Sequence, residues 1–161
     1  MLKMIESFDQ VNMSQLLAVY AQSNIQQGFS CMPNGSQWER ARTGEDAMRV
    51  YIIDFIKTSG TKLAVWVEDG AYVSVLRLEP YANGYLLTGL ETMPDARCKG
   101  YATRLINAVL EIVPECIYSH VCKSNKVSLT VHQNAGFRIL YDYGRLLDGT
   151  VSCSYYTLIA H

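Results

Sequence analysis

The stretch DARCKGYATRLINAVLEIV runs from Asp95 to Val113, and its two halves differ in kind. In the second half, apolar residues recur at helical spacing and predict one buried helix face: Leu105, Ile106, Val109, Leu110 and Val113. The first half places Arg97, Lys99 and Gly100 where that helix should begin. A helix N-terminus is the positive end of the helix dipole and favours anions. Cations and a glycine at this point indicate that a negatively charged ligand completes the site.

The chemistry of this loop suits a pyrophosphate. A helix N-terminus leaves its first backbone N–H groups without helical partners, and a glycine lets a ligand approach the backbone closely. The spacing differs from that of a P-loop, G-x-x-x-x-G-K-S/T, and from the dinucleotide-binding pattern G-x-G-x-x-G. The loop therefore predicts a phosphate site of another kind.

The composition is typical of a single globular domain over residues 1–161, with 49% apolar and 18% charged residues. The 14 basic and 15 acidic residues give a net charge of −1, without the basic excess of nucleic-acid or membrane-surface binders. The 5 cysteines are scattered and form no C-x-x-C pair, which favours reduced thiols and no metal site. Because no signal peptide or apolar span is recognisable, we expect a cytoplasmic protein.

Hydrophobic periodicity and turn residues predict a chain that alternates between helices and strands. The expected helices cover residues 13–22, 38–57, 99–112 and 126–135, and a loop is expected over residues 26–36. The expected strands cover residues 1–8, 62–68, 71–78, 85–93, 116–122, 137–147 and 151–159. Because a helix joins strands 85–93 and 116–122, these two should be parallel with a right-handed crossover. The predicted fold class is α/β, with a mixed, mostly antiparallel sheet and flanking helices in one domain.

Two segments resemble the GNAT acetyltransferase superfamily. RCKGYA, residues 97–102, is similar to the family's pyrophosphate-binding pattern R-x-x-G-x-G/A, with Ala102 in place of the commoner second glycine. NKVSLTVHQNAGF resembles a later block of the family, and five of its residues fall in register: Asn125, Ser128, His132, Gly136 and Phe137. The order of elements also matches over nearly the whole chain. The resemblance implies a GNAT-like fold and an N-acetyltransferase that uses acetyl-CoA.

The resemblance also implies where acetyl-CoA binds. The strand that ends in Thr92 and Met93 would pair with the pantetheine amides and splay from strand 116–122, although Thr92 stands where an aliphatic residue is usual. The loop and the first helical turn would bind the pyrophosphate through Arg97, Cys98, Lys99, Gly100, Tyr101, Ala102 and Thr103. Asn125 and Ser128 would flank the pantetheine arm.

Direct acetyl transfer to an amine requires a base for the amine and an acid for the departing thiolate. Glu91 is the expected base by region, although the family usually draws its glutamate from further upstream, where this chain has Leu86. A solvated or salt-bridged Glu91 is the alternative, and Glu79, His120 or water would then take its place. His132 occupies the position at which the family commonly uses a tyrosine as the general acid, and it is the expected acid here. Alternatively, it only borders the thiol.

The resemblance places the acceptor pocket around the first two helices, their loop and the last hairpin. Phe29, Trp38 and Tyr141 are the expected substrate-contacting residues. The few acids in these segments favour a neutral or zwitterionic small-molecule amine, or a peptide N-terminus, over a polycation. No metal, nucleic acid or membrane is expected as a partner. A homodimer is expected, because the tyrosine-rich C-terminal hairpin offers edge strands.

Two other functions stay open. A non-catalytic acyl-CoA-binding or regulatory domain on the same fold would keep the loop and lose the acid–base pair. A nucleotide-phosphate-binding protein would bind ATP or GTP as tightly as coenzyme A.

Overall fold

The computed structural model describes residues 1–161 as five α-helices, two 3-10 helices and nine strands. The helices are α1 (Met13–Val19), α2 (Ala21–Cys31), α3 (Gln37–Lys57), α4 (Tyr101–Ile112) and α5 (Lys126–Asn134), with η1 (Phe8–Gln10) and η2 (Pro94–Ala96). The strands are β1 (Leu2–Ile5), β2 (Lys62–Glu68), β3 (Ala71–Tyr81), β4 (Gly84–Thr92), β5 (Cys116–Cys122), β6 (Arg138–Tyr141), β7 (Gly144–Arg145), β8 (Val151–Ser152) and β9 (Tyr155–Ala160). None of the helices combines the length and the apolar character that crossing a membrane requires.

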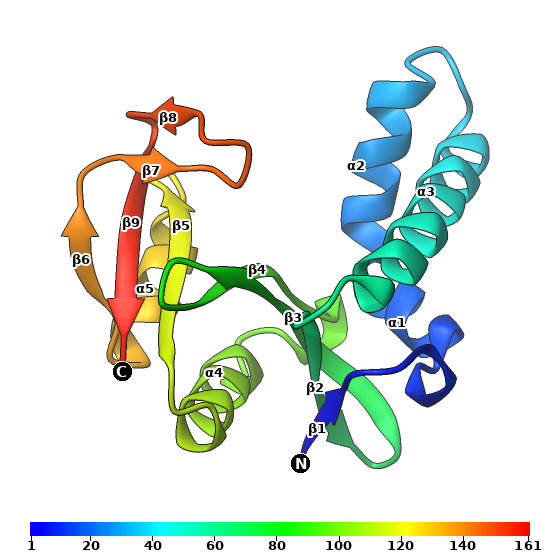
Figure 1. The fold of residues 1–161 in the computed structure, drawn as a ribbon. Coiled ribbons are helices and arrows are strands. Elements are labelled where there is room, and N and C mark those ends of the chain that lie inside the picture. The colour runs from blue at the N-terminus through cyan, green and yellow to red at the C-terminus, as the bar shows by residue number, and fades with distance from the viewer.

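Seven strands form one mixed sheet in the order β1-β2-β3-β4-β5-β9-β6 (Figure 1). Every neighbouring pair is antiparallel except β4 and β5, which are parallel and are joined by the crossover helix α4. β7 and β8 form a separate two-stranded sheet. The predicted α/β fold with one parallel strand pair is thus confirmed.

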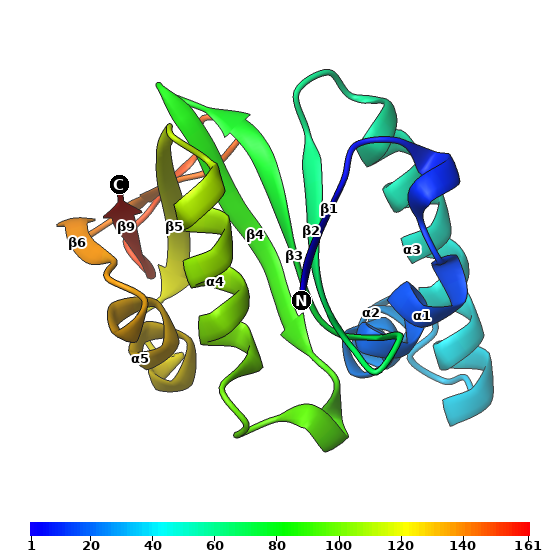
Figure 2. The same cartoon turned by 90° about the horizontal axis from the view of Figure 1, so that it is seen from below.

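Helices cover both faces of the sheet. α4 and α5 pack on one face, whereas α1 and α3 pack on the other, with α2 lying against α3 (Figure 2). Along β3, Leu76 and Leu78 belong to the core beneath α4, and Val75, the residue before Leu76, belongs to the core beneath α1 and α3. The apolar stripe predicted in the stretch 95–113 is the buried face of α4, because Leu105 and its helical neighbours are buried there.

The predicted loop over residues 26–36 is wrong, because α2 continues through Cys31 and only residues 32–36 connect it to α3. Gly28, a helix-breaking residue by propensity, here lets the two helices approach closely. A Cβ at Gly28 would lie 1.8 Å from the carbonyl oxygen of Arg40, and one at Gly44 would lie 1.8 Å from that of Asn24. Backbone contacts that only glycine permits therefore hold α2 against α3.

Two other boundaries differ from the prediction. The expected helix over residues 13–22 is divided at Tyr20, whose backbone (φ −86°, ψ 7°) ends α1 and begins α2. The expected strand over residues 137–147 is also divided, because β6 pairs with β9 while β7 pairs with β8. The turn at Asp148–Gly149 lies between β7 and β8, and Gly149 has a φ of +85° there.

Candidate active site

Strands β4 and β5 separate in the middle of the sheet. They pair from Gly84 with Cys116 to Leu87 with Ser119, and both strands then continue without pairing to each other. Backbone groups on such an open edge can pair with an extended ligand that carries amide groups. The predicted splay of these two strands is therefore present.

A bulge in β4 accompanies the separation. The register between β3 and β4 shifts, so that β4 carries one extra residue between paired positions. Gly89 lies in the bulge with a φ of +55°, and its carbonyl accepts a hydrogen bond from the Tyr20 hydroxyl at 2.7 Å. Burial raises the pKa of Tyr20 to about 12, so this hydroxyl keeps the proton that it donates. The buried tyrosine thereby fixes the bulge.

A cavity of about 250 Å³ lies where the two strands separate. It is lined by Leu87, Thr88, Gly89 and Leu90 of β4, by Ser119, His120 and Val121 of β5, and by Ser128 and His132 of α5. We call this cavity the β4–β5 slot. It brings together two residues that the sequence predicted for the site, Ser128 and His132.

His132 is buried in the wall of the slot, 2% exposed, with its ring packed edge-on against Phe137. Its Nδ1 lies 2.8 Å from the Ser128 carbonyl oxygen, and because a carbonyl only accepts, Nδ1 carries the proton. Nε2 keeps its lone pair and has no hydrogen-bond partner. Burial lowers the pKa of His132 below its ordinary value, and the hydrogen bond to Ser128 opposes this less strongly. At neutral pH the ring is therefore a neutral proton acceptor.

The start of α5 orients this histidine. Asn125 is the N-cap of α5, and its side-chain oxygen accepts a hydrogen bond from the Ser128 N–H at 3.0 Å. Ser128, fixed in the first turn, presents its carbonyl to His132 one turn later. Asn125 itself is exposed. The cap thus acts on the slot through Ser128 and His132.

The loop before α4 presents a run of unpaired backbone donors. Cys98 and Gly100 have positive φ angles of +60° and +79°, and Gly100 is the N-cap of α4. The N–H groups of residues 98–103 donate to no other group of the protein, and the Arg104 N–H bonds back to the Gly100 carbonyl at 3.0 Å. A Cβ on Gly100 would meet nothing within 4 Å, so the space over the loop is open. Consecutive donors at the positive end of a helix dipole suit a pyrophosphate.

Arg97 turns back toward β4. Its Nε donates to the Thr92 carbonyl at 3.1 Å, and its Nη2 lies 3.8 Å from Oε2 of Glu91. The other carboxylate oxygen of Glu91 accepts a hydrogen bond from the Ser23 hydroxyl at 2.5 Å. Glu91 lies opposite Val75, on the sheet face that α1 and α3 cover. Glu91 is therefore held between α2 and the loop before α4.

Both backbone groups of Met93 are already paired. Its N–H donates to the Val73 carbonyl at 2.9 Å, and its carbonyl accepts from the Ala96 N–H at 2.9 Å. The Met93 N–H therefore has no hydrogen bond left to donate to a pantetheine amide. Leu90, which lines the slot, marks the part of β4 that lies along the open edge.

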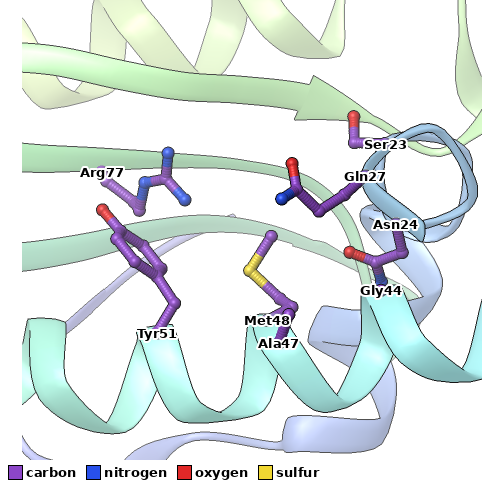
Figure 3. Close-up of a pocket in the computed structure, with 8 residues that line it drawn as sticks. All are labelled: Ser23, Asn24, Gln27, Gly44, Ala47, Met48, Tyr51 and Arg77. Carbon is purple, nitrogen blue, oxygen red and sulfur yellow. The ribbon is translucent and has the colours of Figure 1, made fainter. Parts of the chain in front are cut away.

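A second cavity, of about 340 Å³, lies between α2, α3 and β3 (Figure 3). It is lined by Ser23, Asn24 and Gln27 of α2, by Gly44, Ala47, Met48 and Tyr51 of α3, and by Arg77 of β3. Arg77 is the one charged residue among them, and its guanidinium points into the cavity from the side opposite the Gln27 amide. We call this cavity the Arg77 pocket.

The slot and the Arg77 pocket meet at Gly89. Gly89 lines the slot, and a Cβ added to it would lie 2.4 Å from Nη2 of Arg77. Only a glycine leaves room for the guanidinium at this position. Ser23, which lines the Arg77 pocket, also holds Glu91. The β4 bulge at Gly89 therefore lies at the border between the two cavities.

The unpaired polar atoms of the protein single out the same two cavities. The buried side-chain nitrogen and oxygen atoms without a hydrogen-bond partner are Nε2 of His132, Nε of Arg77 and Nδ2 of Asn24. His132 lines the slot, and Arg77 and Asn24 line the Arg77 pocket. Buried polar groups are nearly always paired, and each exception calls for an explanation such as a missing ligand. The two cavities together therefore form the candidate active site.

The predicted substrate residues Phe29, Trp38 and Tyr141 line neither of these cavities. Phe29 and Trp38 are exposed where α2 ends and α3 begins, and Tyr141 is exposed on the edge strand β6. The prediction placed the pocket around the first two helices, the loop between them and the last hairpin, with the loop expected over residues 26–36. The chain is still helical there, so the cavity lies along the helix pair.

The reserve bases have other partners. Glu79 accepts a hydrogen bond from the Thr88 hydroxyl at 2.7 Å. His120 lines the slot, its Nε2 lies 3.4 Å from the Tyr81 hydroxyl, and burial lowers its pKa. No group of three or more histidine, cysteine, aspartate or glutamate side chains is arranged to hold a metal ion.

Sequence reasoning missed Arg77. A signal was present, because Arg77 stands between Leu76 and Leu78 in a strand expected over residues 71–78, and the structure covers both faces of that strand with helices. A charge at such a position is costly unless it is paired or meets a ligand. What the sequence does not reveal is that Gly89 leaves space beside it.

Comparisons with known proteins agree with this geometry. Residues 29–137 match the model of the Acetyltransferase (GNAT) family. PaiA N-acetyltransferase from Thermoplasma acidophilum, solved in complex with coenzyme A, has a TM-score of 0.67 and 13% identity, covering 99% of this chain and 98% of that chain. An aminoglycoside 6'-acetyltransferase type Ii has a TM-score of 0.65 and 13% identity, covering 99% and 96%.

A GNAT-family acetyltransferase from Bacillus cereus ATCC 10987 has a TM-score of 0.62 and 18% identity, covering 99% of this chain and 96% of that chain. At such identities, these solved structures show the shared fold alone. A search of curated protein sequences finds no significant match.

Proposed function

Since the chain belongs to the GNAT acetyltransferase family, we propose that it transfers the acetyl group of acetyl-CoA to a primary amine of a small molecule or peptide. The observation that carries this proposal is the open β4–β5 slot with the unpaired Nε2 of His132 in its wall. β4 leads from this slot directly into the unpaired N–H donors of residues 98–103. One extended substrate can use both.

In the proposed complex the donor substrate lies along the open edge of β4. Its pyrophosphate accepts hydrogen bonds from residues 98–103, and Lys99 adds positive charge. Its pantetheine arm fills the slot beside Leu90 and passes Ser128. Its thioester lies near Gly89 and His132, where the slot borders the Arg77 pocket.

The proposed chemistry moves two protons away from an incoming ammonium. Glu91 takes the first, which frees the amine lone pair for attack on the thioester carbonyl. The amine nitrogen of the resulting tetrahedral adduct still carries one proton too many, and the neutral Nε2 of His132 accepts it. As the carbon–sulfur bond breaks, the imidazolium returns that proton to the departing thiolate. His132 is thereby the acid for the thiol and ends the cycle neutral.

Thermal unfolding tests the binding part of the proposal. Acetyl-CoA should raise the melting temperature more than pantetheine does, because pantetheine lacks the phosphates. Gly100→Asp places a carboxylate against the loop and should remove the difference. Gly70→Asp is the matched control, because Gly70 has the same φ of +79° and open surroundings but lies between β2 and β3. Equal shifts from the two ligands in the unaltered protein would show that the loop does not bind the pyrophosphate.

Release of free thiol from acetyl-CoA across a panel of amines tests the catalytic part. A binding shift without thiol release for any amine would identify a non-catalytic acyl-CoA-binding domain instead. The assay belongs under reducing conditions, since all five cysteines are free. Free thiols also support the proposed cytoplasmic location.

A further inference from the structure

We propose, resting on the acetyl transfer proposed above, that the amine acceptor also carries a carboxylate and that Arg77 binds this carboxylate. The acceptor class is then a small amino acid or a related molecule with one amine and one acid. The inference starts from Arg77 and the pocket that it lines.

The charge of Arg77 has no partner in the protein. Neither of the two ion pairs involves it, and its guanidinium donates no hydrogen bond. Its neighbours are aromatic faces, with the Tyr51 ring centroid 4.7 Å and the Tyr20 ring centroid 5.8 Å from Cζ. Aromatic faces stabilise a cation but leave its N–H groups unpaired. The guanidinium therefore keeps its full capacity to bind an anion.

The carboxylates on this face of the sheet are engaged elsewhere. Glu79, two residues along β3 from Arg77, accepts the Thr88 hydroxyl. Glu91 accepts the Ser23 hydroxyl and lies next to Arg97. No carboxylate of the chain forms an ion pair with Arg77, so its guanidinium is open to an anion from outside.

The other polar groups of the pocket are neutral. Asn24 is 2% exposed and its Nδ2 is unpaired, and the Gln27 amide faces Arg77 across the cavity (Figure 3). A planar carboxylate accepts two hydrogen bonds from a guanidinium fork and has lone pairs left for an amide N–H. A polycationic amine would meet a like charge that nothing in the pocket offsets. The pocket volume of about 340 Å³ suits a small molecule.

The position of the pocket places the amine at the thioester. Arg77 lies against Gly89, and Gly89 also lines the slot. A carboxylate on the guanidinium therefore anchors the acceptor beside the β4 bulge. Its amine then lies between Glu91 and the slot, where the acetyl group is to be transferred.

Matched acceptors test this directly. Amino acids are compared with their carboxamides and with the corresponding amines without the carboxyl group, with thiol release as the readout. The carboxylates should have a kcat/KM roughly tenfold to hundredfold higher, the range for a hydrogen bond to a charged group. Equal rates for acids and amides, or faster rates for polyamines, would overturn the proposal.

Two variants separate the anion site from a folding effect. Arg77→Met keeps the aliphatic stem and should bring the kcat/KM for carboxylates down to that for the matched carboxamides. Gln27→Glu places a carboxylate opposite an intact Arg77 and should remove the same preference. Gln26→Glu is the matched control, because Gln26 is exposed on α2 outside the pocket. A preference that survives both Arg77→Met and Gln27→Glu would exclude Arg77 as the anchor.

The outcomes also separate this inference from the proposed function. If acetyl-CoA binds but no amine of any class releases thiol, the acetyl transfer fails. If neutral or cationic amines are acetylated and carboxylates are not, the acetyl transfer stands and the carboxylate site is wrong.

Discussion

At the scale of single residues, burial sets the role of His132. The ring has lost water on nearly every side, and its one hydrogen bond fixes the proton on Nδ1. A histidine in this state cannot donate a proton from Nε2 until it has first received one. A tyrosine at the same position would be an acid at rest. In the proposed reaction, the histidine must therefore accept a proton before it can donate one to the thiolate.

His132→Phe should keep the affinity for acetyl-CoA and lower turnover by roughly 10²-fold or more, the usual scale of general acid–base catalysis. Binding is preserved because phenylalanine still packs on Phe137. Loss of turnover without loss of binding marks an interaction made in the transition state. Thermal shift gives the affinity and thiol release gives the rate. A variant within about twofold of the wild-type rate would leave His132 as a wall of the slot.

The protonation state of His132 also predicts how turnover depends on pH. Because burial lowers the pKa of His132, the neutral and competent ring persists as the pH falls to about 6.5, the ordinary histidine value, and is lost only below it. Turnover should therefore fall on the acidic side, and that fall should be absent in His132→Phe. A His132-dependent fall that begins above pH 7 would contradict a neutral acceptor.

At the scale of elements, the α2–α3 pair depends on two glycines in helices. Propensity alone ranks glycine about 1 kcal/mol below alanine inside a helix. Packing reverses this ranking, because the Cβ of an alanine at Gly28 would lie 1.8 Å from a backbone carbonyl oxygen. A helix backbone gives way less easily than a flexible side chain. The Arg77 pocket, which lies between these helices and the sheet, depends on that close approach.

Gly28→Ala should therefore destabilise the protein, by about 1–3 kcal/mol as expected for overpacking, instead of stabilising it. Urea unfolding measures the difference. Gln26→Ala, on the exposed side of the same helix, is the control and should change stability by a few tenths of a kcal/mol. A stability gain in Gly28→Ala would mean that α2 and α3 are not in close contact in solution.

The contrast between local propensity and tertiary packing also explains which features the sequence predicts and which it does not. The strands expected over residues 62–68 and 71–78 and the buried face of α4 follow from local periodicity and turn chemistry, and they are confirmed. The β4–β5 splay follows from the resemblance to the family. The continuation of α2 past Gly28 does not, because only the partner helix decides whether that glycine breaks the helix or packs. The absence of a partner for Arg77 is likewise a property of three dimensions.

At the scale of the whole molecule, the two parts of the candidate active site lie on opposite faces of the sheet. α4 and α5 carry the loop of residues 98–103 and His132, whereas α2 and α3 line the Arg77 pocket on the other face. The two sides meet at the β4 bulge, where Gly89 has no side chain to separate them. In the proposed function, donor and acceptor therefore enter from different sides, and the acetyl group is transferred at Gly89. A sheet without the splay would keep them apart.

The edge strands of the sheet are where a second copy of the chain could pair. The sheet ends in β1 on one side and β6 on the other. β6 exposes Ile139 and Tyr141 at 46% and 48%, and an exposed apolar edge strand is a ready site for pairing with another copy. We therefore expect a homodimer that uses the β6 edge.

Light scattering at micromolar concentration should give about twice the chain mass of 18.1 kDa. Ile139→Lys adds a charge to the edge and should return the mass to that of one chain. Val127→Lys is the matched control, because Val127 is also apolar and exposed, at 77%, but lies on helix α5 and not in the sheet. It should leave the dimer intact. A mass of one chain across the whole concentration range would exclude the dimer, and a dimer unaffected by Ile139→Lys would place its interface elsewhere.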